Sequence, residues 1–342
     1  MRVAIDAQLM LGTPTGIGEY VAGLIAHLPL AGIDPIPLQF KPLDPWRFDR
    51  RVAWDQVLLP VAAARSRADL LHCASGTMPA ITAMPTVVTV HDVAWQRAQS
   101  HARGYARWYF GAFSLRRYAR ARRIIVDSEF SRSELLSMLD VPAERVGVVY
   151  PGVADDFCRI ARTARSDVPT VLSVGTVERR KNLAVVIEAL AELEGVRLVV
   201  MGPSTPYRAE CEQLAQRLGI ANRICFSGYV ERSALLDAYA SADVAVVPSR
   251  YEGFGYAAAQ ALCAGVPVLV ARTSSLPEIV AGDATLLDPG ESSAWRNAIA
   301  QILDDPGAAR TRAERLRGAA IARFGWKASV ARLAQNYQIA LA

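Results

Sequence analysis

Lysine is scarce in this chain. Only Lys41, Lys181 and Lys327 are lysines among 38 Lys and Arg side chains, and these outnumber 33 Asp and Glu to give a formal net charge of +5. A GC-rich coding bias accounts for the excess of arginine. A lysine kept under such a bias is a candidate for a chemical role, because a compact ammonium and a planar guanidinium are not interchangeable. The mildly basic charge suits an anionic ligand, but it does not by itself indicate nucleic acid.

Other features are also missing. The five cysteines are scattered and odd in number, without a CxxC pair, which argues against a disulfide framework and a zinc site. No stretch reaches the roughly 18 charge-free apolar residues of a transmembrane helix. Asp6 interrupts the N-terminal segment where a signal peptide has its apolar core. We therefore expect a cytoplasmic protein.

Short apolar runs alternate with longer helical patterns along the whole chain. Near-continuous β-branched runs are typical of strands buried on both faces of a parallel sheet, and their alternation with helices predicts an α/β fold with βαβ crossovers. The expected strands are 2–7, 36–40, 70–73, 86–91, 123–127, 146–150, 170–174, 196–201, 224–226, 244–248, 267–271 and 285–287. Helices are expected at 18–28, 182–193, 207–218, 232–240 and 257–264.

The length predicts about two domains. The alternation pauses at 155–169, a polar, Arg-rich stretch that we interpret as an interdomain linker. We expect a Rossmann-like domain at 1–160 and a second at 168–325. Ligands of such doubly wound sheets bind beyond the carboxyl ends of the strands, so the chemistry is expected in the loops that follow strands.

The most informative of these loops follows the strand at 244–248, in the string VAVVPSRYEGFGYAAAQALCAGVP. Its residues Glu252, Gly253, Phe254 and Gly255 lie between the strand and a helix. The glycines allow close approach of the backbone to a ligand, and the helix start offers N–H groups to an anion. An acid at this place is poorly explained by structure alone, although a helix-start acid favoured by the dipole is the alternative. Gln260 lies about two turns into the helix.

A second loop reads VGTVERRKNL, directly after the strand at 170–174. Its cations Arg179, Arg180 and Lys181 stand at the start of a helix, where they oppose the helix dipole unless an anion joins them. The alternative is a solvated basic turn.

Two weaker motifs lie in the first half. Gly16 and Gly18 enter a helix after the first strand, a pattern that suits phosphate contact but occurs in many α/β proteins. Val21 occupies the third position of the dinucleotide fingerprint, which argues against an NAD-dependent dehydrogenase. His91 leaves a buried strand next to Asp92, and is either a catalytic candidate or a structural histidine.

The PSRYEGFG and VGTVERRKN strings resemble the signatures of the family-4 retaining glycosyltransferases. The resemblance implies the GT-B fold, in which two Rossmann-like doubly wound parallel-sheet domains face a central cleft. It also implies roles: Glu252 contacts the donor sugar, Arg180 and Lys181 bind the donor diphosphate, the loop at Gly16 closes on that diphosphate, and His91 lies beside the reacting sugar. Gly253, Phe254 and Gly255 belong to the same donor-binding motif.

The chain departs from this family at Gln260, where the pattern has a second glutamate that holds the ribose hydroxyls. A glutamine accepts one hydrogen bond and donates another, but it does not accept from both hydroxyls as a carboxylate does. Thr176 stands where many members have arginine, and Arg180 is expected to replace it. The helix at 326–342 resembles the family's last helix, which returns to pack on the first domain.

The resemblance implies a retaining glycosyltransferase that moves a sugar from a UDP- or GDP-sugar, such as GDP-mannose, to a hydroxyl of an oligosaccharide, glycolipid or natural-product acceptor. No cofactor and no metal are expected, since no DxD-like motif ends a strand. Contexts are antibiotic biosynthesis, as for avilamycin, or lipopolysaccharide and polysaccharide assembly. The alternatives are a nucleotide-sugar epimerase or phosphorylase of the same fold, and a non-catalytic nucleotide-sugar-binding protein.

The stretch 95–123 has eight arginines, many aromatics and no acid. It is either a partly buried helix or, between Arg97 and Arg123, a surface for an anionic acceptor or for the inner face of an anionic membrane. Stacked aromatics and arginine also suit single-stranded nucleic acid, but no known binding module is visible, so we expect no nucleic acid partner.

Overall fold

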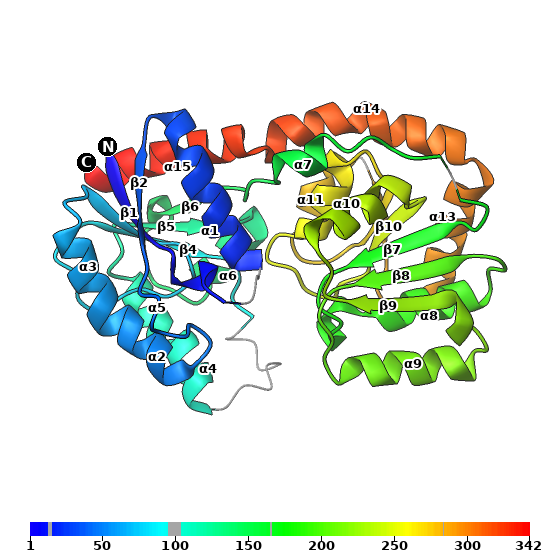
Figure 1. Ribbon diagram of the computed structural model, residues 1–342, viewed down its shortest axis with the longest axis horizontal. Helices are drawn as coiled ribbons and strands as arrows, with labels where there is room; N and C mark the ends of the chain where they lie inside the picture. Colours follow the sequence, from blue (N-terminus) through cyan, green and yellow to red (C-terminus); the bar gives the residue numbers. More distant parts are fainter. Residues whose placement is uncertain (13–15, 95–103, 165, 283) are drawn as a thin grey trace. The chain divides into compact units, whose positions relative to one another are not determined.

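The chain folds into two compact units. The structure, a computed structural model, describes residues 1–342 apart from 13–15, 95–103, 165 and 283 (Figure 1). Unit 1 comprises Met1–Gly152 together with Trp326–Ala342, and unit 2 comprises Val153–Gly325.

The change from unit 1 to unit 2 comes earlier than the linker expected at 155–169. Helix α7 (Asp155–Cys158) already belongs to unit 2, because its Phe157 is buried with its ring 5.3 Å from that of Tyr239. The polar, Arg-rich composition of the stretch therefore does not mark a free linker.

Unit 1 contains a six-stranded parallel sheet in the order β2-β1-β3-β4-β5-β6. Its strands are β1 (Arg2–Asp6), β2 (Asp34–Leu38), β3 (Leu70–Cys73), β4 (Thr86–Val90), β5 (Arg123–Val126) and β6 (Val146–Val148). The strand β2 begins two residues earlier than expected and includes Pro35 and Pro37. Both prolines are tolerated because β2 lies at the edge of the sheet, where fewer backbone N–H groups are needed for pairing.

Each face of this sheet carries its own apolar core. One core includes Leu24 and Leu333, and the other includes Trp54 and Leu135. The helices of unit 1 are α1 (Gly16–His27), α2 (Phe48–Ala53), the π-helical turn η3 (Trp54–Leu58), α3 (Leu59–Arg65), α4 (Gly104–Phe110), α5 (Ala112–Tyr118), α6 (Glu129–Leu136) and α15 (Trp326–Leu341).

The terminal helix α15 packs on α1, as Figure 1 shows. Two glycines make room for its first residue, because a Cβ at Gly23 or Gly152 would lie 2.0 Å and 2.2 Å from ring atoms of Trp326. A hydrogen bond also joins α15 to the sheet, because Nδ1 of buried His72 lies 2.7 Å from the hydroxyl of Tyr337. The last helix is thus part of the core of unit 1.

Unit 2 contains a second six-stranded parallel sheet, in the order β12-β11-β10-β7-β8-β9. Its strands are β7 (Thr170–Val174), β8 (Arg197–Met201), β9 (Ile224–Gly228), β10 (Val244–Val247), β11 (Val268–Ala271) and β12 (Thr285–Leu287). Counted from β7, this is the dinucleotide-binding order 3-2-1-4-5-6, whereas unit 1 has the flavodoxin-like order 2-1-3-4-5 with one further strand. The expected pair of doubly wound parallel sheets is confirmed, with a different winding in each unit.

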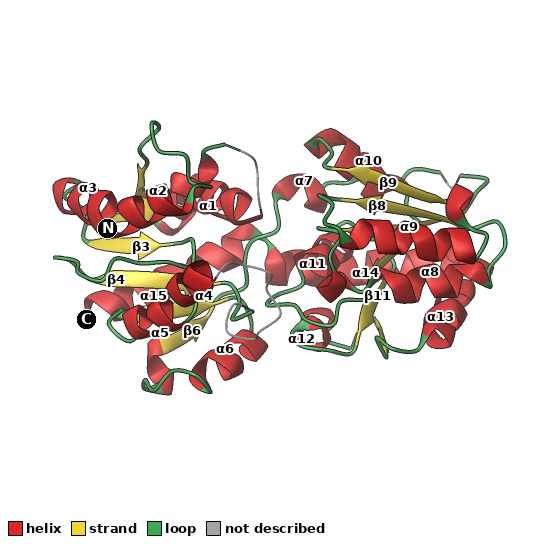
Figure 2. Ribbon diagram, turned by 90° about the horizontal axis from the view of Figure 1, so that it is seen from below, coloured by secondary structure: helices red, strands yellow, loops and turns green. Residues whose placement is uncertain are grey.

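Helices cover both faces of the second sheet (Figures 1 and 2). Helices α8 and α9 lie on one face, whereas α10, α11 and α14 lie on the other. Their bounds are α8 (Leu183–Ala191), α9 (Tyr207–Arg217), α10 (Arg232–Ser241), α11 (Tyr256–Cys263), α12 (Leu276–Val280), α13 (Ser292–Asp304) and α14 (Pro306–Phe324). Among the described helices of the whole chain, none has the length and apolar character needed to cross a membrane.

Candidate functional site

Strands β7 and β10 form the switch point of the second sheet. They are neighbours, but from β7 the chain continues to β8 on one side, and from β10 to β11 on the other. The loops after such a pair separate at the carboxyl edge, where open α/β sheets bind their ligands. Both informative motifs of the sequence, RRKN and EGFG, lie in these two loops.

The two loops meet in a cluster of charged and polar side chains, which we call the Glu252 cluster. It comprises Glu252, Lys181, Arg180 and Ser249. The Nζ of Lys181 lies 2.6 Å from Glu252 Oε1, and Arg180 Nη1 lies 3.1 Å from Oε2. Ser249 donates from Oγ to Oε1 at 2.7 Å. Arg179 lies apart from the cluster and pairs with Glu210 at 2.7 Å. The structure therefore selects Arg180 and Lys181 from the three adjacent cations.

The electrostatics of this cluster favour an ionised acid. Burial of the Glu252 carboxyl acts to raise its pKa, but Lys181 and Arg180 outweigh burial and hold the pKa below its ordinary value. The carboxylate is buried, whereas the side chains of Lys181 and Arg180 are 23% and 29% exposed. The cations can thus reach a solvent-borne anion while the acid stays in place behind them.

Asn182, a residue that the sequence analysis did not single out, ties the loops together. It adopts a left-handed backbone conformation with φ of 54°. Its Nδ2 donates to the carbonyls of Pro248 at 3.1 Å and Pro289 at 2.7 Å. Asparagine tolerates this conformation better than most residues, which is the signal that could have identified it.

The EGFG loop is shaped by Gly255, the N-cap residue just before α11, which has a φ of 95°. A Cβ there would lie 2.7 Å from Leu276 Cδ2, so a larger residue meets both backbone strain and a clash. Gly253 is buried in the same loop. Phe254 is a core residue, since its buried ring lies 5.7 Å from that of Phe324.

Gln260 lies on α11 and faces α10. The hydroxyl of Tyr239 donates to its Oε1 at 3.2 Å, and the side chain is buried. Among the described residues, the side chain of Gln260 makes no hydrogen bond to the Glu252 cluster. Its role toward a ribose stays a prediction.

In unit 1, His91 follows β4 and has both ring nitrogens engaged. Its Nδ1 lies 2.8 Å from Asp127 Oδ2, and its Nε2 lies 3.0 Å from the carbonyl of Ala74. Burial acts to lower the pKa of His91, but Asp127 and then Ala74 outweigh it and raise the pKa. Because a carboxylate and a carbonyl only accept hydrogen bonds, a doubly protonated ring fits this place.

Gly16 is the first residue of α1, with open space where a Cβ would lie. The rest of its expected phosphate loop, 13–15, lies outside the described residues. The roles expected of Gly16 and His91 toward a donor stay predictions.

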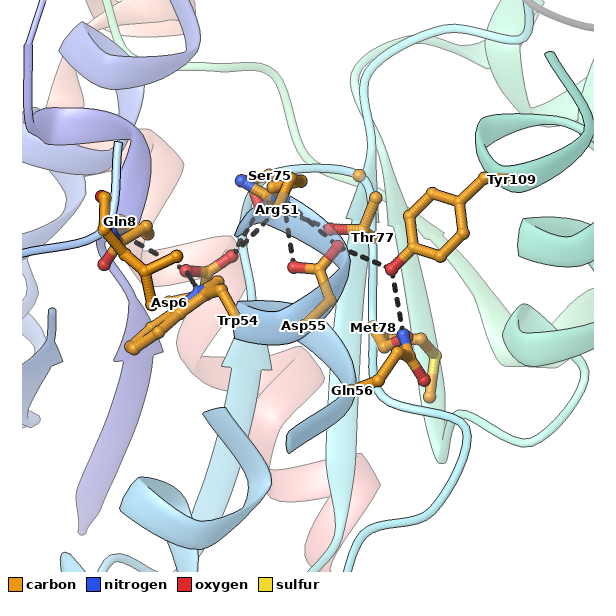
Figure 3. Close-up of polar contacts among 12 residues, drawn as sticks. Asp6, Gln8, Arg51, Trp54, Asp55, Gln56, Ser75, Thr77, Met78 and Tyr109 are labelled. Atoms are coloured by element: carbon orange, nitrogen blue, oxygen red, sulfur yellow. Dashed lines mark hydrogen bonds and ion pairs between the residues drawn. The ribbon is translucent and has the colours of Figure 1, made fainter. Parts of the chain in front are cut away.

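The switch point of the first sheet, between β1 and β3, holds a buried polar network that the sequence analysis missed (Figure 3). Arg51 donates from Nη2 to Ser75 at 2.6 Å and lies 3.3 Å from Asp6 Oδ2. Its Nε lies 3.0 Å from Asp55 Oδ1, and Tyr109 donates to Asp55 Oδ2 at 2.9 Å. We call these residues the Arg51 network.

The arginines between Arg97 and Arg123 divide into two groups. Arg117 is fully buried and donates to the carbonyl of Met78 at 2.6 Å, and Arg123 donates to Asn336 at 2.7 Å, so both stabilise the fold of unit 1. Exposed side chains are those of Arg116, Arg120 and Arg122. Arg97 and Arg103 lie outside the described residues, as does the side chain of Arg107.

Two family models match consecutive parts of the chain. "Glycosyltransferase Family 4" matches residues 15–157, and "Glycosyl transferases group 1" matches residues 157–322. The chain belongs to the GT-B glycosyltransferases. The Glu252 cluster lies wholly within the group 1 domain of this glycosyltransferase.

A curated relative agrees with this membership, and solved structures share the fold. D-inositol 3-phosphate glycosyltransferase of Mycolicibacterium smegmatis is 33% identical over 235 residues, which are 65% of this chain and 54% of that protein. The chain thus spans about half the length of this curated relative. Sucrose-phosphate synthase of Thermosynechococcus elongatus matches with a TM-score of 0.78 and 23% identity, covering 98% of both chains. HepE of Anabaena, in complex with UDP and glucose, matches with a TM-score of 0.75 and 20% identity over 99% of both chains. These two structures show the fold of the glycosyltransferase.

Proposed function

We propose that this glycosyltransferase moves a sugar from a nucleotide-diphosphate sugar to a hydroxyl of an acceptor, with retention at the anomeric carbon. The observation that carries the proposal is the Glu252 cluster, in which two partly exposed cations face a buried carboxylate at the switch point of the second sheet. The pair of cations suits a diphosphate, and the carboxylate suits sugar hydroxyls.

The residues of the cluster would act by changing partners. An arriving diphosphate competes for Lys181 and Arg180, and Glu252 is then free to accept hydrogen bonds from hydroxyls of the donor sugar. In the transfer, the bond from the anomeric carbon to the diphosphate oxygen breaks, a bond to the acceptor oxygen forms, and the proton of the acceptor hydroxyl passes to the departing diphosphate. Negative charge grows on the departing diphosphate, where fixed cations stabilise it more than they stabilise the ground state.

A UDP-sugar is the first donor to test. HepE, which shares the fold, was crystallised with UDP, with UDP and glucose, and with UDP-glucose. A GDP-sugar is the second, since the VGTVERRKN and YPGV strings resemble those of GDP-mannose users.

A phosphorylated cyclitol is the first acceptor to test, because the curated relatives are named D-inositol 3-phosphate glycosyltransferases. Oligosaccharide, glycolipid and natural-product acceptors stay predictions. The same holds for the antibiotic, lipopolysaccharide and polysaccharide contexts, and the comparisons give no support for avilamycin in particular.

The deciding experiment measures release of free UDP or GDP from a panel of donors with and without acceptors, with the sugar product analysed by mass spectrometry. Release that depends on the acceptor supports transfer. An altered sugar still attached to the nucleotide would indicate an epimerase, and a sugar phosphate formed only with inorganic phosphate would indicate a phosphorylase. Binding of UDP without turnover on any acceptor would favour a non-catalytic binding protein.

We also propose that unit 1 makes peripheral contact with an anionic membrane. Exposed Arg116, Arg120 and Arg122 supply charge, and Tyr105 and Trp108 are about half exposed. Co-sedimentation with phosphatidylglycerol vesicles tests this contact. Equal recovery with uncharged vesicles would contradict it.

A further inference from the structure

Unit 2 has a second basic site, separate from the Glu252 cluster. A hollow of about 520 Å³ lies beside α14. Its lining residues are Arg162, Gly265, Arg310, Thr311, Glu314 and Arg315. We call it the α14 pocket. Its volume lies within the range of small-molecule sites and exceeds what a bare inorganic anion needs.

The α14 pocket lies at the amino edge of the second sheet. Arg162 donates to the carbonyls of Tyr239 and Ala242, just before β10 begins, and Gly265 comes just before β11. Ser249 of the Glu252 cluster follows the other end of β10. The length of that strand therefore puts about 13 Å between the two edges, so one small ligand does not fill both sites.

The charges of the pocket are unbalanced toward the cationic side. Three arginines line it against one acid, Glu314, which already pairs with Arg317 at 3.3 Å. A buried acid that does not line the pocket, Asp243, lies 3.6 Å from Arg310 Nη2. It also accepts a hydrogen bond from the backbone N–H of Thr170 at 2.9 Å. Glu314 and Asp243 thus each have another partner, and they do not balance the three arginines of the pocket.

The positive charges of Arg162 and Arg310 also act on each other. Burial first, and then the charge of Arg310, lowers the pKa of Arg162 to about 10. The buried Nε atoms of Arg162 and Arg310 have no hydrogen-bond partner among the residues that the structure describes. Buried donors without acceptors and like charges that repel each other are both unfavourable, and a bound oxyanion would offset the excess of positive charge.

We propose that the α14 pocket binds a small phosphate ester, whose phosphate group is held by Arg162, Arg310 and Arg315. Planar guanidinium groups recognise phosphate by paired hydrogen bonds. The remaining volume takes the polyol or sugar part of the ester. The site is distinct from the donor site and does not depend on the proposed transfer reaction.

The test is calorimetric titration of the full chain with inorganic phosphate and with glucose 6-phosphate. Because Lys181 also attracts phosphate, the titrations are repeated on Lys181→Ala, which weakens the Glu252 cluster as a competing phosphate site. We expect both ligands to bind Lys181→Ala, with the ester binding more tightly than inorganic phosphate. Equal affinity for the two would overturn the ester assignment, and absence of binding would overturn the site.

The variant Arg315→Glu, made in the Lys181→Ala protein, tests the residues of the pocket. Arg315 is exposed, so its replacement leaves the core intact. We expect the dissociation constant to rise by at least about tenfold, as for loss of a charge-assisted contact. Arg312→Glu is the matched control, since Arg312 is exposed on the same helix but does not line the pocket. Equal losses in both variants would show a general charge effect and contradict the site.

Discussion

The two sheets both place cations against carboxylates at their switch points, but the two arrangements differ in access. In unit 2, Lys181 and Arg180 are 23% and 29% exposed around buried Glu252. In unit 1, the side chain of Arg51 is only 4% exposed, and those of Asp6 and Asp55 are fully buried. One cluster is open to a ligand on its cationic side, and the other is closed.

Solvent exposure of the cations distinguishes a binding site from a structural network here, whereas position in the fold does not, because both clusters lie at a switch point. In the open cluster the cations can exchange Glu252 for a dissolved anion and stay paired, while Glu252 keeps the hydrogen bond from Ser249 and can accept others from a ligand. In the closed network every partner of Arg51 comes from the protein, and the loops after β1 and β3 are held to η3 through it. Removal of a cation should therefore affect binding in unit 2 and stability in unit 1.

The strongest test of the contrast is Arg51→Ala. The change leaves Asp6 and Asp55 buried without their counterion, and breaking a buried pair in this way costs about 3–5 kcal/mol. We expect the free energy of unfolding, measured with urea at neutral pH, to fall by about that amount. A decrease of less than about 1 kcal/mol in the free energy of unfolding would show that the Arg51 network does not stabilise unit 1.

The converse test is Lys181→Ala. We expect acceptor-dependent transfer to fall by about 10²–10³-fold, as for loss of one group that stabilises developing charge. Stability should fall by less than in Arg51→Ala, since Arg180 and Ser249 still hold the buried carboxylate of Glu252. Urea unfolding and kcat/KM on the same preparation check both parts. Lys327→Ala is the control lysine, and a change of transfer there would contradict the assignment.

The open cluster could be predicted from the sequence, whereas the closed network could not. The RRKN and EGFG strings each lie within one loop, next to an apolar strand, and the sheet order brings the two loops together. The Arg51 network instead takes single residues from separate elements, such as Asp6 at the end of β1 and Arg51 in α2, and neither lies in a motif that stands out in the sequence. No periodicity or local spacing links such a pair, so only the folded chain identifies it.

The fold itself was largely predictable because it depends on local patterns. Each expected strand appears in the structure, with ends shifted by at most two residues. The winding of the first sheet was not predictable in the same way, since the order of strands depends on crossover geometry rather than on composition. The roles of the arginines were equally hidden, because Arg117 and Arg120 read alike in sequence but one is buried and the other exposed.

A third prediction compares two neighbouring histidines of unit 1, His91 and His72. The raised pKa of His91 means that its stabilising effect is fully present below the ordinary pKa of about 6.5 and is lost as pH rises through the raised value. We therefore expect His91→Gln to cost about 2 kcal/mol near pH 6 and less at pH 9. Urea unfolding across this range measures the difference.

His72 should show the opposite dependence on pH. Burial lowers the pKa of His72 to about 3, so the wild-type chain loses stability as pH falls below about 6.5, where the unfolded histidine gains a proton. We expect His72→Gln to cost most near pH 8 and least near pH 5. Parallel pH profiles for the two variants would contradict the assignment of a charged His91 and a neutral His72.

The smallest expected effect comes from adding a carboxylate on the helix that follows the open cluster, by Gln260→Glu. The Oε1 of Gln260 accepts a hydrogen bond from Tyr239, and a carboxylate can keep this bond while its second oxygen accepts from a ribose hydroxyl. We expect the dissociation constant of UDP to fall by about threefold to tenfold in calorimetric titration, the range of one improved hydrogen bond. Gln260→Met, which is apolar and of similar length, is the matched control and should weaken binding. Weaker binding of UDP by Gln260→Glu as well would mean that this position is adapted to glutamine. The cost of burying an added carboxylate on α11 would then exceed the gain from its hydrogen bond to the ribose.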